Sequence, residues 1–68
     1  MEQYNLILKT ALNKNFEELT EVEQLVLTLK WVKTKLQNVQ QNEERAFLEA
    51  LAVKVITHLE EHNIYYNK

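Results

Sequence analysis

The stretch TEVEQLVLTLKWVKTKLQNV, residues 20–39, decides the fold of this chain. Its apolar residues recur at alternating steps of three and four, which is the a/d pattern of a helix that packs lengthwise against another helix. The seam consists of Val22, Leu25, Leu29, Val32, Leu36 and Val39. Thr20 followed by Glu23 forms a capping box, so a long helix is predicted to begin here. The stretch therefore predicts an all-α protein built around a helix over residues 20–40.

The residues after this helix carry a second apolar seam that is out of phase with the first. Its members are Leu48, Leu51, Ala52, Val55, Leu59 and His62. A break within NVQQNEER, residues 38–45, explains the change of phase, with Asn42 as the N-cap of a helix over 43–64. One continuous helix that changes faces is the alternative. The preferred interpretation is an antiparallel helical hairpin made of helices 20–40 and 43–64.

A shorter helix is predicted in front of the hairpin, over residues 2–13. Its apolar positions at three- and four-residue spacing are Tyr4, Ile7, Leu8, Ala11 and Leu12. Asn15 and Glu18 form a second capping box, which predicts one turn of helix over 16–19. The chain is therefore expected to be a single helical domain, residues 1–68, that packs as a small bundle.

The composition supports few turns and long helices. The 68 residues include no Gly, Pro or Cys, and the formal net charge is −2. A chain of this size buries only about 60% of its unfolded surface, and without thiols it has no disulfide to compensate. We therefore expect oligomerisation, as a homodimer, to complete the bundle. The absence of a long apolar run and of a signal-peptide pattern predicts a cytoplasmic protein that does not enter a membrane.

Several apolar residues exceed what a hairpin needs, and these are the candidate protein interface. They are Leu27, Trp31, Phe47, Ala50, Val53 and Ile56, with Val26 beside the first two. The favoured interpretation of Trp31 and Leu27 is that the first helix covers them with Tyr4, Leu8 and Leu12. The alternative is an exposed anchor, because Trp is enriched among the residues that dominate binding interfaces.

The stretch HLEEH, residues 58–62, matches the H-x-x-E-H spacing of some zinc proteases. A catalytic zinc needs three protein ligands, and the chain has no Cys, no Asp and no other His. His58 and His62 are therefore only weak metal candidates, and we expect them to end a helix, where imidazolium suits the helix dipole. No cofactor and no enzymatic activity are predicted.

Lys30, Lys33 and Lys35 form a modest basic edge on the long helix. Nucleic-acid-binding domains generally carry a much larger basic surplus, so a solvated face is expected and nucleic acid is not a predicted partner. The predicted function is a small non-enzymatic regulator or inhibitor that binds another protein through apolar helix surfaces, a kind of protein found among prokaryotic and viral regulators. A small-molecule-binding helical oligomer is the alternative, and metal binding by His58 and His62 is the third.

Overall fold

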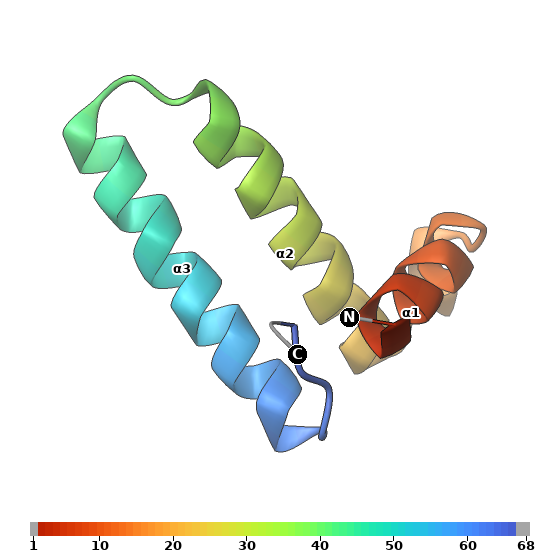
Figure 1. Ribbon diagram of the computed structural model, residues 1–68. Helices are drawn as coiled ribbons and strands as arrows, with labels where there is room; N and C mark the ends of the chain where they lie inside the picture. Colours follow the sequence, from red (N-terminus) through yellow and green to blue (C-terminus); the bar gives the residue numbers. More distant parts are fainter. Residues whose placement is uncertain (1, 67–68) are drawn as a thin grey trace.

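The computed structural model describes residues 2–66 as three α-helices and one short 3-10 helix (Figure 1). The elements are α1 (Glu2–Leu12), η1 (Phe16–Glu18), α2 (Glu21–Asn38) and α3 (Asn42–Glu61). The predicted all-α class with three packed helices is confirmed. Helices α2 and α3 lie side by side and run in opposite directions, and α1 lies on the other side of α2. No helix within residues 2–66 is long and apolar enough to span a membrane.

The N-terminus of α2 is fixed by the capping box at Thr20, as predicted. The backbone amide of Glu23 donates to Thr20 Oγ1 at 3.2 Å, and the amide of Thr20 donates to Glu23 Oε1 at 2.9 Å. Glu23 is only 6% exposed, and its Oε2 lies 2.9 Å from Lys14 Nζ. The hydrogen bond from the Thr20 amide, followed by the bond from Lys14, lowers the pKa of the Glu23 carboxyl. This cluster joins the segment after α1 to the start of α2.

Helices α2 and α3 are separate, so the alternative of one continuous helix is wrong. The backbone of Gln41 is extended (φ −89°, ψ 134°), and its carbonyl accepts a hydrogen bond from the Arg45 amide at 3.0 Å. Gln41 is therefore the N-cap, and the predicted N-cap Asn42 is instead the first residue of the helix. The Arg45 guanidinium also donates to the carbonyl of Val39 at 3.2 Å, which holds the connection against α3.

The contact between α2 and α3 uses most of the predicted seams. The buried residues are Leu29 and Val32 on α2 and Leu48, Val55 and Leu59 on α3, with the other apolar seam positions partly exposed. Two predictions about the seam are wrong. Val26, assigned to the outer edge of its helix, is fully buried, whereas His62, assigned to the inner seam, is exposed.

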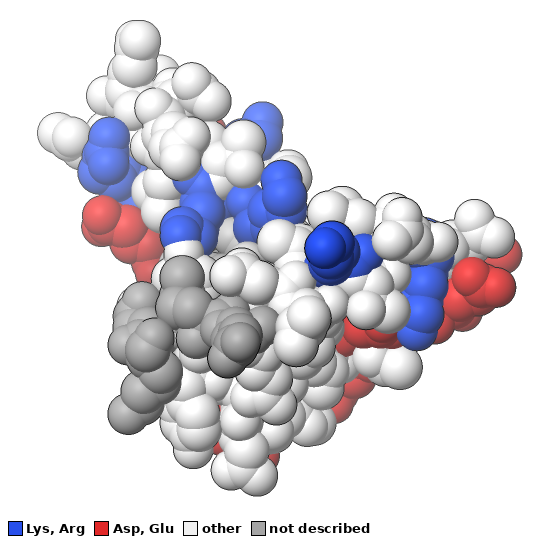
Figure 2. All heavy atoms as spheres, turned by 45° about the vertical axis from the view of Figure 1, so that its right-hand side comes forward, with Lys and Arg blue, Asp and Glu red and all other residues white. Residues whose placement is uncertain are grey.

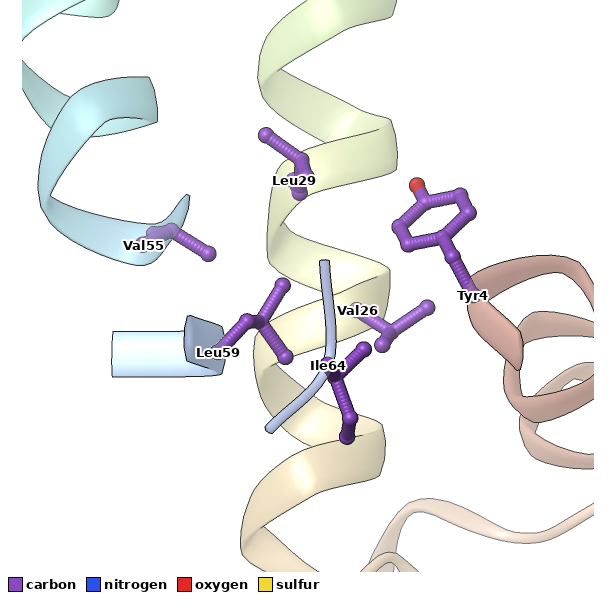
Figure 3. Close-up of a cluster of buried hydrophobic side chains, with 6 residues drawn as sticks. All are labelled: Tyr4, Val26, Leu29, Val55, Leu59 and Ile64. Atoms are coloured by element: carbon purple, nitrogen blue, oxygen red, sulfur yellow. The ribbon is translucent and has the colours of Figure 1, made fainter. Parts of the chain in front are cut away.

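Val26 is buried because α1 and the C-terminal segment contribute to the core in addition to α2 and α3. Figure 3 shows Tyr4 from α1 and Ile64 from the C-terminal segment converging on α2 beside Val26. The Tyr4 ring also stacks edge-on against Tyr66, with ring centroids 4.9 Å apart, and burial raises the pKa of the Tyr4 phenol. The residue Leu12, predicted to cover α2, is 60% exposed and takes no part in this core.

The chain reverses sharply after α3, which ends at Glu61 and not at the predicted residue 64. The amide of Asn63 donates to the carbonyl of Glu60 and the amide of Ile64 donates to the carbonyl of Leu59, both at 2.9 Å. This pair of bonds is a Schellman motif, which requires a left-handed residue, and Asn63 has φ 63°. Asn takes this conformation more readily than most residues, and the chain has no Gly. The turn delivers Ile64 onto Leu59.

Candidate functional site

The strongest candidate site is an apolar groove on the outer side of α2. It has a volume of about 330 Å³ and is lined by Phe16, Leu19, Gln24, Leu27, Thr28 and Trp31. We call this surface the Trp31 groove. Trp31 is 52% exposed and Phe16 is 75% exposed, which is unusual for side chains of this size. The groove therefore presents two aromatic side chains to solvent on one surface.

The short helix η1 forms one wall of the groove because two capping boxes follow each other closely. The amide of Asn15 donates to Glu18 Oε1 at 3.2 Å, and the capping box at Thr20 begins α2 directly afterwards. Leu19 then occupies the position before the α2 N-cap, where an apolar residue commonly packs against the fourth helical residue. The fourth residue of α2 is Gln24, so Leu19 lacks the usual apolar partner, and Leu19 and Gln24 both line the groove.

Trp31 lies on the side of α2 that faces away from the buried residues. At 100° per residue, it is turned about 160° from Leu29, which points into the core. The favoured prediction that α1 covers Trp31 is therefore wrong: α1 packs on the side of α2 that carries Val26. Leu27, the other predicted member of this surface, is partly exposed and lines the groove.

A second apolar surface lies on the outer side of α3. Phe47 is 66% exposed and Val53 is 63% exposed, and together with Ala50, Leu51 and Lys54 they line a shallow groove of about 370 Å³. We call this surface the α3 outer face. Three of the predicted interface residues, Phe47, Ala50 and Val53, are brought together here. Ile56 is not among them, because it is partly buried against the core cluster.

The three lysines of α2 are exposed, and two of them contact aromatic rings. Lys33 Nζ lies 4.2 Å from the centroid of the Tyr66 ring, and Lys35 Nζ lies 5.8 Å from the centroid of the Trp31 ring. Both distances are within the range of cation–π attraction. Within residues 2–66, the salt bridges to carboxylates come from Lys14, His58 and His62, so none of the three α2 lysines is paired with an acid.

The two histidines of HLEEH each contact a different glutamate. His58 Nδ1 lies 3.4 Å from Glu61 Oε1 in the same helix, and His62 Nε2 lies 3.1 Å from Glu21 Oε2 at the start of α2. His62 is the C-cap of α3, so it links the end of that helix to the beginning of α2. In the part of the chain that the structure describes, no three His, Asp or Glu side chains are grouped so that they could hold a metal ion.

Phe16 and Leu19 are the apolar members of the Trp31 groove that sequence reasoning did not identify, and the polar Gln24 and Thr28 were not identified either. A single turn of 3-10 helix is too short to show a periodic pattern, so nothing marked these residues as belonging to a surface. The available signal was the apolar Leu19 next to a helix N-cap whose fourth residue is polar. That combination leaves an apolar side chain without its usual partner.

The Trp31 groove and the α3 outer face are suited to contact with another molecule. They offer aromatic and aliphatic side chains, and aromatic side chains are enriched at binding interfaces. Lys35 lies at the edge of the Trp31 groove and Lys54 lines the α3 outer face. No family model, no curated protein and no solved structure matches this chain.

Proposed function

We propose that this protein is a small non-enzymatic regulator or inhibitor that binds another protein through the Trp31 groove. The observation that carries the proposal is the half-exposed Trp31, which shares an apolar groove with Phe16 and Leu27. Burying a large apolar side chain contributes about 1.5–3 kcal/mol, so exposure of Trp31 and Phe16 forgoes stabilisation that a partner could supply. Trp is also the residue type most typical of interface hot spots.

The α2–α3 pair acts in this proposal as a helical hairpin whose two outer sides have different roles. The Trp31 groove and the α3 outer face are lined by different residues, the first by residues of η1 and α2 and the segment between them, and the second by residues of α3. A second copy of the chain covers the α3 outer face and leaves the Trp31 groove free. Ala46 and Ala50 lie one helical turn apart on α3, and their small side chains allow two helices to approach closely.

The homodimer is tested by the molar mass in solution, measured by light scattering. We expect the mass of two chains at micromolar concentration, and the mass of one chain for Val53→Glu, which buries a charge in the contact. Glu49→Gln, an exposed change elsewhere on α3, is the matched control and should remain dimeric. A wild-type protein with the mass of one chain would contradict the dimer without affecting the Trp31 groove.

Partner binding is tested by placing a photo-crosslinking amino acid at single positions and irradiating intact cells. Position 28 lies in the Trp31 groove and keeps the indole of Trp31 in place, whereas position 37 is an exposed site on the same helix that the groove does not include. We expect one discrete adduct with another protein from position 28 and none from position 37. The same adduct yield from both positions, or none from position 28, would contradict the proposed function.

A further inference from the structure

The charge around the Trp31 groove is distributed unevenly along α2. Between Glu23 and Glu43 the chain contains no acidic residue, and Lys30, Lys33 and Lys35 lie in this interval. Lys30 directly precedes Trp31, and Lys35 lies one turn beyond it with its ammonium group over the indole ring. Lys33 contacts the Tyr66 ring and so does not border the groove, which leaves Lys30 and Lys35 as the lysines at its Trp31 end. That end is therefore basic, although the whole chain has a formal net charge of −2.

The opposite end of the groove is acidic. Glu17 and Glu18 lie in η1 beside Phe16, and both are exposed. On the face that Figure 2 presents, basic side chains lie in a band across the molecule, and the acidic side chains, all of them Glu, lie beside and below this band. A ligand of the groove thus meets opposite charges at its two ends.

The backbone of this protein limits the form that such a ligand can take. An extended peptide generally binds by adding a strand to the edge of a sheet, where main-chain hydrogen bonds hold it. Residues 2–66 contain no strand, so no such edge is present among them. A helix satisfies its own backbone hydrogen bonds and offers apolar side chains at three- and four-residue spacing, which suits a groove that spans Gln24 to Trp31, about two helical turns.

We infer that the Trp31 groove binds an amphipathic helix of the partner protein whose apolar side chains enter the groove and whose acidic side chains lie at the Trp31 end. This inference rests on the proposed function and adds the chemistry of the partner. Lys30 and Lys35 attract the acidic end, and Glu17 and Glu18 repel acidic residues at the Phe16 end. Because these charges are exposed, they select among partners and speed association more than they strengthen the complex.

The test is a selection from a displayed library of helical peptides about 16 residues long, a length at which an isolated helix becomes marginally stable. The library contains no Trp, so the emission of Trp31, the only Trp in the protein, reports binding in the groove directly. The targets are the wild type and the variants Trp31→Ala, Lys30→Gln/Lys35→Gln and Lys54→Gln. The last of these removes a lysine from the α3 outer face and is the matched control.

We expect the selected peptides to carry acidic residues clustered at one end and to shift Trp31 emission to shorter wavelength. Their affinity should fall roughly five- to tenfold in Lys30→Gln/Lys35→Gln, as expected for loss of two exposed ion pairs, and should stay within about twofold in Lys54→Gln. Raising the salt concentration from about 0.05 to 0.5 M should weaken binding of the selected peptides to a similar degree, because salt screens the attraction between the lysines and the acidic side chains.

Three other results would overturn the inference. Selected peptides that are neutral or basic but still shift Trp31 emission would leave the proposed function in place and contradict the inference that the bound helix is acidic. If no peptide both shifts Trp31 emission and loses affinity in Trp31→Ala, the inference and the proposed function are both contradicted. A single-stranded oligonucleotide of about 20 residues that quenches Trp31 more strongly than the peptides would show that the lysines and the indole bind nucleic acid.

Discussion

Leu59 and Phe47 are large apolar residues on the same helix, yet Leu59 is fully buried and Phe47 is 66% exposed. The same contrast occurs on α2, where Leu29 is fully buried and Trp31 is 52% exposed. In each helix the inner residue meets another part of the chain and the outer residue meets solvent. Apolar content alone therefore does not identify the core of a small helical protein. The inner faces form the core, and the outer faces expose large apolar side chains to solvent.

The largest expected effect comes from breaking the inner face. Leu59→Ala should reduce the free energy of unfolding by about 2–5 kcal/mol, because it removes buried methyl groups and leaves a cavity in the core. Val53→Ala, on the α3 outer face, is the matched control and should change the unfolding free energy of the monomer by no more than about 0.5 kcal/mol. Urea unfolding at low protein concentration measures both. Equal losses in the two variants would abolish the distinction between the faces.

Much of the inner face could be predicted from the sequence, because it depends on local periodicity. The seam through Leu29 and Val32, the capping box at Thr20 and the break before α3 all follow from spacing and capping chemistry within short windows. The error at Asn42 concerns one residue at a helix end, where Gln41 becomes the N-cap through its backbone alone. Patterns within short stretches of sequence therefore predicted where the helices lie and much of the side that each turns toward the core.

The outer faces could be predicted only in part, because they depend on where other segments of the chain pack. Trp31 and Val26 are both apolar and both outside the a/d seam, and their sequence context does not tell which one α1 covers. The reversal at Asn63 decides that Ile64 enters the core, and it depends on one residue in a left-handed conformation. The Trp31 groove also needs η1, whose single turn shows no periodicity.

A smaller effect is expected from the cap that begins α2. Thr20→Ala should reduce the free energy of unfolding by about 1 kcal/mol, because the Glu23 amide loses its hydrogen-bond acceptor. Thr34→Ala is the control: the Thr34 hydroxyl is exposed and donates within α2 to the carbonyl of Lys30, and Ala has the higher helix propensity. Chemical unfolding of the two variants should therefore separate them. A Thr20→Ala protein as stable as Thr34→Ala would mean that the cap does not support the inner face.

The carboxyl group of Glu23 predicts a dependence of stability on pH. Its pKa is lowered in the folded protein, so its contribution is present at neutral pH and is lost as the pH falls below about 4.3, the ordinary glutamate value, and through the folded-state pKa. Glu23→Gln should consequently show a smaller loss of stability on acidification than the wild type, in melting temperatures measured from pH 7 to 3. Glu49→Gln should behave like the wild type. Identical acid sensitivity of Glu23→Gln and the wild type would contradict this role.

The smallest effect on stability is expected from the residue on which the proposed function depends. Trp31→Ala should change the free energy of urea unfolding by no more than about 0.5 kcal/mol, as is usual for a surface substitution, because Trp31 lies outside the core cluster. A loss of about 3 kcal/mol or more, the range seen when a buried aromatic residue is truncated, would show that Trp31 belongs to the core. The outer side of α2 would then be part of the fold and not a free binding surface.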